Sequence, residues 1–172
     1  MKRLFICIIF IMLVTSILFS TVYGNSYGNV PVDIQAKLFL KILAFNNDVN
    51  KGGEVTVHVI NSHEFAAEIN KSVGTKIGKS ELVTVNDARE LPSQKPSVIY
   101  IGDSAIFDEI IKYTRSNNVL SLTGIPDLVK KGATLGVGVS DGKPKVLLNL
   151  SSSKKEGISW NPVILKISKI YK

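Results

Sequence analysis

Hydrophobic positions along the chain switch repeatedly between strand-like and helical spacing. Ile34, Leu38 and Ile42 recur at helical intervals, which predicts a well-buried amphipathic helix over residues 32–46. Short apolar runs predict strands at residues 54–60, 82–85, 97–101, 119–122, 133–139 and 145–150. Helices are expected at residues 61–72, 105–115 and 162–171, with a helical turn at residues 124–127.

The order of these elements predicts the fold class. Strands that alternate with helices indicate a parallel sheet with right-handed crossovers and helices on both faces. The last two strands flank Ser140-Asp141-Gly142, a hairpin signal. We therefore expect one three-layer α/β/α domain whose sheet is mostly parallel and ends in a C-terminal antiparallel hairpin.

The first 24 residues have the order of a signal peptide. A basic start, Met1-Lys2-Arg3, precedes apolar residues 4–19 and the stretch Thr21-Val22-Tyr23-Gly24. The apolar run is shorter than the roughly 20 residues that span a bilayer core, which disfavours a permanent anchor. We expect cleavage after Gly24, export to the periplasm, a flexible leader at residues 25–31 and a domain at residues 32–172.

Composition narrows the choice of partners. The chain has 21 basic and 14 acidic residues, a net charge of +7, and removal of Lys2 and Arg3 would leave +5. The lysines are scattered and, like Asp87 and Glu90, are interpreted as solvated charge, so no nucleic-acid partner is expected. Contact with a membrane is expected only through the signal peptide before cleavage. Cys7 is the only cysteine, so the processed chain could form no disulfide.

Candidate chemistry is sparse. The only histidines are His58 and His63, which fall on a strand and at the following helix start. A metal site formed by these two and Glu64 is conceivable, but such positions rarely converge. The glycines of residues 136–142 precede a strand, unlike a dinucleotide-binding fingerprint. We therefore expect no catalytic residues, no metal and no cofactor.

One architectural site remains at the strand ends. In open α/β sheets, ligands bind beyond the carboxyl ends of parallel strands, where helix N-termini offer free N–H groups. The candidate ligand-binding residues there are Asn61, Ser62, His63, Gly102, Asp103, Ser104 and Gly124. Helix capping explains the same residues, since Asn61 and Glu64 have capping-box spacing.

Several segments together resemble the YfiR family of small periplasmic proteins. They are QAKLFLKIL at 35–43, SVIYIG at 97–102, VLSLTG at 119–124, GATLGVG at 132–138, KVLLNL at 145–150, EGIS at 156–159 and PVILKIS at 162–168. The resemblance implies a non-enzymatic protein that binds the periplasmic part of an inner-membrane signalling protein, such as a diguanylate cyclase, and holds it inactive. A homodimer is an open possibility, and partner contact is placed on Lys37, Lys41 and Phe45 of the first helix.

The chain departs from the YfiR pattern in two respects. The family's disulfides have no counterpart here, and Asn46-Asn47-Asp48 stands where members often carry Trp-Pro. A redox-sensing role is therefore not carried over. The alternative is a solute-binding protein built like one lobe of a transporter receptor, and a small exported enzyme has no residue set behind it.

Overall fold

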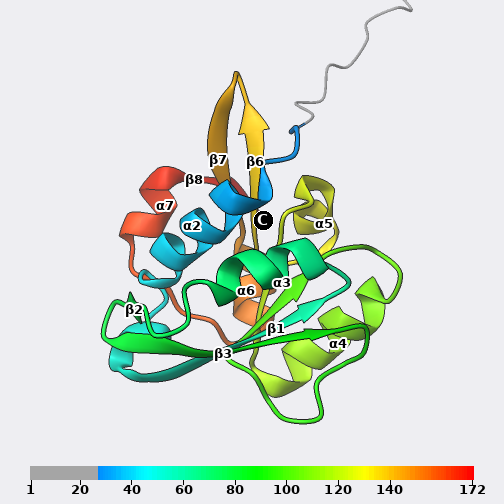
Figure 1. The fold of residues 1–172 in the computed structure, drawn as a ribbon. Coiled ribbons are helices and arrows are strands. Elements are labelled where there is room, and N and C mark those ends of the chain that lie inside the picture. Colours follow the sequence, from blue (N-terminus) through cyan, green and yellow to red (C-terminus); the bar gives the residue numbers. More distant parts are fainter. Residues whose placement is uncertain (1–26) are drawn as a thin grey trace, which may run out of the picture.

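Alternating strands and helices build one eight-stranded sheet in residues 27–172, the part of the chain that the structure, a computed structural model, describes (Figure 1). The strands are β1 (Gly53–Ile60), β2 (Lys76–Ile77), β3 (Ser80–Ala88), β4 (Val98–Ile101), β5 (Leu120–Thr123), β6 (Leu135–Ser140), β7 (Lys143–Asn149) and β8 (Ser168–Tyr171). Their order across the sheet is β2-β3-β1-β4-β5-β6-β7-β8.

The expected fold class is confirmed. Strands β3, β1, β4, β5 and β6 run parallel to one another, whereas β6 and β7 form the antiparallel hairpin around Asp141 and Gly142. Both turn residues have positive φ, which favours the tight reversal that the sequence predicts. In Figure 1 the hairpin projects beyond the rest of the sheet.

Helices cover both faces of the sheet because its strands are apolar on both sides. The helices are α2 (Val32–Leu43), α3 (His63–Asn70), α4 (Phe107–Asn117), α5 (Pro126–Lys131), α6 (Leu150–Lys155) and α7 (Val163–Ile167), with a 3-10 turn η1 (Val49–Lys51). Helices α2, α3 and α7 pack on the face that carries Val57 and Leu122, and α4 and α5 pack on the face that carries Ile99 and Ile101. This three-layer arrangement leaves the strand ends open for a site.

The C-terminus differs from the expected helix over residues 162–171. Helix α7 has only five residues, and β8 follows it directly, parallel to β7 from Val146↔Ser168 to Asn149↔Tyr171. The edge of β7 offers free backbone partners, and this tertiary pairing overrides the helical spacing of the sequence. The helix expected there is therefore wrong beyond Ile167.

Two shorter elements were not expected from the sequence. Strand β2 pairs antiparallel with β3 at the other edge of the sheet. Helix α6 begins where residue 150 was expected to be the end of a strand, because the Asn149 side chain accepts a hydrogen bond from Ser152 N at 3.0 Å. Asn149 thus acts as an N-cap that follows a strand without a loop.

The described part of the segment expected to be a flexible leader contacts the sheet. Gly28 pairs with Val139 of β6 through backbone hydrogen bonds of 2.9 and 2.8 Å, and Val30 is buried. The expected signal peptide, residues 1–24, lies outside the described residues. Within residues 27–172, no helix has the length and apolarity needed to cross a bilayer.

Candidate functional site

The carboxyl ends of three parallel strands meet at one edge of the sheet. Ile60, the last residue of β1, lies opposite Ala88 of β3 and Ile101 of β4, so the three strands end level with one another. A groove of about 660 Å³ opens beyond them, lined by Asn61, Ser62, His63, Asp87, Ala88, Arg89 and Asp103. Four of the seven strand-end candidates from the sequence are therefore brought together in this strand-end groove.

The floor of the strand-end groove depends on a close approach of two turns. Asn61 has a positive φ of 56°, and its backbone N–H donates to Ala88 O at 3.0 Å. Its side-chain Nδ2 donates to Asp103 Oδ1 at 3.2 Å. A Cβ on Gly102 would lie only 2.3 Å from Asn61 O, so this position needs glycine.

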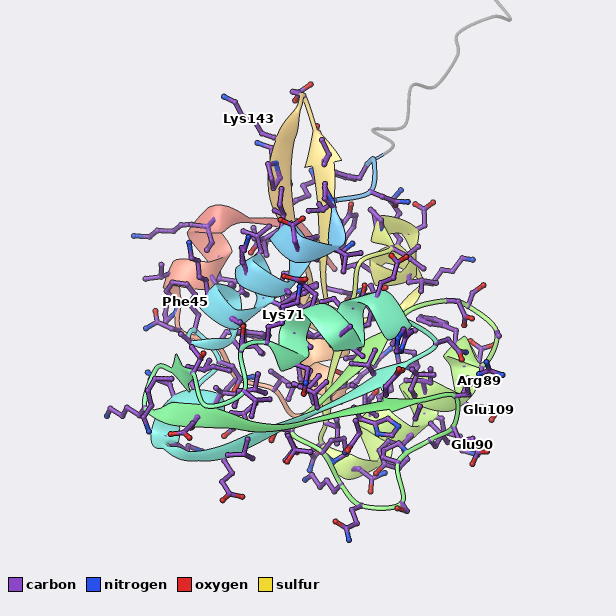
Figure 2. The ribbon with its side chains drawn as sticks, viewed as in Figure 1. Phe45, Lys71, Arg89, Glu90, Glu109 and Lys143 are labelled. Carbon is purple, nitrogen blue, oxygen red and sulfur yellow. The ribbon has the colours of Figure 1, made fainter. Side chains whose placement is uncertain are left out.

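Charges of both signs line the strand-end groove. His63 Nδ1 lies 2.5 Å from Asp87 Oδ2, and the His63 side chain is largely exposed. Arg89 is exposed at the end of β3, where Figure 2 shows it at the rim of the domain. Asp103 completes the set. Side chains of both charges can bind the two oppositely charged ends of a zwitterionic ligand.

Ser62 is the N-cap residue of α3, but its side chain makes no capping hydrogen bond. The capping box expected between Asn61 and Glu64 is therefore wrong, because the helix begins at His63 rather than after Asn61. The Ser62 side chain instead lies beside the Tyr100 hydroxyl. Capping by side chains therefore does not account for the polar residues at this turn.

Beneath the strand-end groove lies a buried set of polar groups, the Tyr100 network. Its members are Val30, Gln35, Ser62, Tyr100 and Gly124. Tyr100 Oη donates to Gln35 Oε1 at 2.8 Å, and Gln35 Nε2 donates to the Val30 carbonyl at 2.7 Å. Burial raises the pKa of Tyr100 to about 12, although hydrogen bonds to Gly124 and Ser62 oppose the rise. The Tyr100 network therefore ties α2 to the strand ends with a neutral phenol.

Gly124 is part of this buried network rather than of the open groove. A Cβ there would lie 2.1 Å from Gln35 Oε1 and 2.6 Å from Tyr100 Oη. Glycine at this position therefore leaves room for the Gln35–Tyr100 hydrogen bond, and a ligand in the groove would not touch it directly.

Ser104 lies outside the strand-end groove as well. It borders a separate hollow of about 450 Å³, together with Asp108, Glu109 and Lys131. Helix α4 begins at Phe107, two residues later than expected, and Ser104 belongs to the loop before it. Figure 2 shows Glu109 of this helix near Arg89 in the view.

The two histidines do not converge. His58 is buried in β1, and its Nε2 lies 2.9 Å from the Glu90 carbonyl, whereas His63 contacts Asp87. Among residues 27–172, no three potential metal ligands of the His, Cys, Asp and Glu types lie together.

Sequence reasoning missed Asp87 and Arg89 as groove residues. Strand β3 was expected to end near Val85, but it continues to Ala88 alongside β1. The alternating burial of Leu82 and its neighbours fades toward the end of the strand, so the apolar pattern stops before the strand does. Pairing with β1, which the sequence does not show, extends it.

The partner-contact candidates lie on and just after α2. Lys37 and Lys41 are exposed one turn apart, and Lys37 Nζ lies 3.4 Å from Asp33 Oδ2. Phe45 follows the helix and packs partly against the core, while its carbonyl accepts a hydrogen bond from Asn161 N at 2.8 Å. Figure 2 shows Phe45 and Arg89 on opposite sides of the domain.

A second buried polar set, the Glu156 cluster, consists of Thr114, Ser121, Thr134 and Glu156. Glu156 is 0 % exposed; its Oε1 lies 2.7 Å from Thr114 Oγ1 and 2.6 Å from Ser121 Oγ, and its Oε2 accepts from Ser121 N at 3.1 Å. Burial raises the pKa of the Glu156 carboxyl, and hydrogen bonds from the Ser121 side chain, the Thr114 side chain and the Ser121 N–H oppose the rise.

The geometry around Thr114 fits a protonated Glu156. Thr114 Oγ1 also lies 3.1 Å from the Ile111 carbonyl, and its single hydroxyl proton can serve only one of the two acceptors. If Glu156 carries a proton, it can donate to Thr114 while Thr114 donates to Ile111. The Glu156 cluster therefore joins α4 and β5 to the end of α6 through one acid.

The domain has an open sheet with helices on both faces and a groove at the strand ends. These features define the class of α/β proteins in which ligands bind at the strand ends. The sequence profile of the YfiR/HmsC-like family matches residues 33–169. The chain belongs to the YfiR/HmsC-like family, and the resemblance noted in the sequence is confirmed. No curated protein matches the chain.

Two solved structures share the fold. A conserved domain protein from Vibrio cholerae O1 biovar El Tor strain N16961 aligns with a TM-score of 0.55 at 16% identity, over 83% of this chain and 60% of that one. The ABC domain in complex with L-Trp from Streptococcus pneumoniae aligns with a TM-score of 0.52 at 15% identity, over 83% of this chain and 62% of that one. The chain thus spans about three fifths of the length of these structures.

Proposed function

We propose that this chain is a periplasmic regulator that binds an inner-membrane signalling protein, such as a diguanylate cyclase, and controls it by direct contact. The observation that carries the proposal is the family match, which covers residues 33–169 and so nearly all of the described domain. The signal-peptide pattern of residues 1–24 supports export. In this proposal the protein catalyses no reaction and acts through its surface.

The proposed contact is the exposed side of α2. Lys37 and Lys41 present two positive charges one turn apart, and Phe45 adds an aromatic ring at the end of the helix. Charges at the rim of an interface mainly accelerate association and select a partner of opposite charge. We therefore expect an acidic strip on the partner.

Co-purification from membranes tests this contact. A tagged full-length chain is expressed in its host, the membranes are solubilised, and retained proteins are identified. The variant Lys37→Glu/Lys41→Glu should lose the partner, whereas Lys71→Glu/Lys76→Glu, which reverses charges at the end of α3 and on β2, should retain it. Equal retention by both variants would remove α2 as the contact, and recovery of the chain only from the cytoplasm would contradict a periplasmic role.

A second candidate function is a single-lobe solute receptor. It is favoured by the strand-end groove, which brings Asn61, His63 and Asp87 together with Arg89 and Asp103. The Streptococcus pneumoniae domain of similar fold is described in complex with L-Trp, so free amino acids are the first ligands to test.

A thermal-unfolding screen separates the two functions. A ligand present at 100 times its dissociation constant would add about 2.7 kcal/mol to the free energy of unfolding. Stabilisation by an amino acid that disappears in Arg89→Ala would favour the receptor function. Unchanged unfolding temperatures with all amino acids would remove it and leave the regulatory function as the single proposal.

A further inference from the structure

Helix α7 exposes an unusual number of apolar side chains for its length. Of its five residues only Ile164 enters the core, while Val163, Leu165 and Ile167 remain 43, 45 and 49% exposed. These are among the most exposed large apolar side chains in the described part of the chain. Figure 1 shows α7 at the periphery of the domain, at one end of the sheet.

The chain's only tryptophan lies next to this helix. Trp160 is half-buried, and its Nε1 donates to Ser153 Oγ at 2.8 Å. It borders a shallow hollow of about 290 Å³ that also contains Leu150, Pro162 and Leu165. Exposed apolar surface is therefore continuous from the turn before α7 onto the helix itself.

The exposed charges along residues 157–172, the segment that carries this surface, have one sign. Residues 157–172 contain Lys166, Lys169 and Lys172, all exposed, and no acidic residue. The nearest preceding acid, Glu156, is completely buried. Across the molecule, residues 124–172 hold nine basic and three acidic side chains, whereas residues 27–123 hold ten basic and eleven acidic ones. The positive charge of the domain is thus concentrated in its C-terminal part.

We propose that this surface, the α7 face, lies against an anionic lipid bilayer. We define the α7 face as Trp160, Val163, Leu165, Lys166, Ile167 and Lys169. The apolar side chains would enter the boundary between headgroups and acyl chains, and the lysines would meet lipid phosphates. Trp160, with an apolar body and a polar N–H, suits the same boundary.

The composition of the α7 face favours a lipid surface over a protein partner. Protein interfaces are depleted in lysine, whereas lysines beside exposed tryptophan and aliphatic side chains are typical of surfaces that lie on anionic lipids. Every basic residue after Arg115 is a lysine. The proposal is independent of the regulatory contact on α2, and it adds a membrane contact that would persist after loss of any signal peptide.

Vesicle binding tests the proposal directly, because the fluorescence of Trp160 reports whether the α7 face contacts lipid. The purified protein is mixed with vesicles of phosphatidylglycerol and phosphatidylethanolamine, or with vesicles of phosphatidylcholine alone. We expect Trp160 emission to move to shorter wavelength, and the protein to sediment, only with the anionic vesicles. Added salt should weaken the binding, since exposed charges are screened within about 8 Å at physiological ionic strength.

Matched variants assign the binding to the α7 face. Lys166→Glu/Lys169→Glu should lower partitioning more than tenfold, because each lysine near an anionic surface contributes about fivefold. Leu165→Ser/Ile167→Ser should lower it about tenfold through lost apolar burial. The controls are Lys71→Glu/Lys76→Glu for charge and Val73→Ser, 44% exposed, for apolar exposure, and both should bind as the wild type does.

Three results would overturn the proposal. They are unchanged Trp160 emission with anionic vesicles, equal losses in test and control variants, and a spectral shift with soluble polyglutamate but none with vesicles. The last result would assign the α7 face to an acidic polypeptide. Circular dichroism of each variant, unchanged from the wild type, shows that a loss of binding is not a loss of folding.

Discussion

Tyr100 and Glu156 are both buried side chains with polar ends, and each joins elements that are distant in the sequence. Tyr100 connects β4 to α2 through Gln35, below the strand-end groove. Glu156 connects the end of α6 to α4 and β5 through Thr114 and Ser121. One network thus supports the groove and α2, and the other supports the C-terminal part that carries the α7 face.

The two networks differ in how they respond to protons. Burial raises both pKa values, that of Tyr100 to about 12 and that of Glu156 above its ordinary value. The phenol therefore stays neutral at any physiological pH, whereas the carboxyl can lose its proton as the pH rises. The protonation of the Tyr100 network is therefore unchanged below pH 10, whereas that of the Glu156 cluster depends on pH.

Replacement of Glu156 should give the largest effect. Glu156→Leu leaves the Ser121 N–H and the Ser121 hydroxyl without their acceptor and removes one partner of the Thr114 hydroxyl. Because unsatisfied buried polar groups are costly, we expect the free energy of unfolding to fall by about 3–5 kcal/mol. Urea unfolding measures the loss, and Glu109→Leu on the exposed side of α4 should change it by less than about 0.5 kcal/mol. A loss as small as in Glu109→Leu would show that the Glu156 cluster does not hold this side of the domain.

A methyl group at Gly102 should give the next largest effect. In Gly102→Ala the new Cβ would lie 2.3 Å from the Asn61 carbonyl oxygen, so the backbone of one of the two turns below the groove must shift. Such overpacking costs about 1–3 kcal/mol. In the control Gly28→Ala the new Cβ meets its nearest neighbour, Val139, at an ordinary 3.8 Å, and stability should change little. Equal midpoints in urea for both variants would refute the close approach of the two turns.

Removal of the Tyr100 hydroxyl should have a smaller effect. Tyr100→Phe keeps the ring stacked on Phe65, whose centroid lies 3.6 Å away, but loses the hydrogen bond to Gln35. We expect a loss of about 1 kcal/mol in the free energy of unfolding. A double-mutant cycle with Gln35→Ala isolates the pair, and a coupling energy near zero would show that the two side chains act separately.

The pH dependence of stability separates the two networks. The folded-state pKa of Glu156 is raised, so its stabilisation is fully present below the unfolded value of 4.5 and is lost as pH rises through the folded pKa. One proton gives a slope of at most about 1.4 kcal/mol per pH unit. Glu156→Gln should remove this decline, which unfolding curves measured from pH 4 upward can detect.

Tyr100 should change the pH dependence of stability only at high pH. Its contribution is present below pH 10 and is lost as pH rises from 10 through about 12. Tyr100→Phe should therefore leave the decline at lower pH unchanged and remove only the alkaline one. If Tyr100→Phe instead removed the decline that we assign to Glu156, the two networks would be coupled and the comparison would fail.

The sequence predicted the interior of the sheet well because local pattern and tertiary pairing agree there. The buried apolar residues of β1 and β4 divide between the two cores, one on each face of the sheet. At the C-terminus the local sequence pattern and the tertiary pairing disagree. Residues 168–171 have helical spacing with the preceding ones but pair with the edge of β7, a partner that no local pattern reveals.

The candidate site was predictable in outline only. Rules for parallel sheets place Asn61, Ser62, His63 and Asp103 at one edge, and the structure brings them together. Whether Asp87 and Arg89 line the groove depends on how far β3 extends. In the sequence, Tyr100 looks like one more apolar residue of a buried strand. The burial of Glu156 has no local signal in the sequence, because it results from the packing of α4, β5 and α6.

Cyclic-di-GMP in living cells tests the central claim, regulation of a membrane cyclase by contact through α2. Cells that lack the chain are complemented with the wild type, with Lys37→Glu/Lys41→Glu, or with Lys71→Glu/Lys76→Glu, each at equal abundance. We expect the loss of the chain to raise cyclic-di-GMP, and the wild type and the Lys71/Lys76 variant to restore the low level. The Lys37/Lys41 variant should leave it high. Cyclic-di-GMP that is the same with and without the chain would contradict the account.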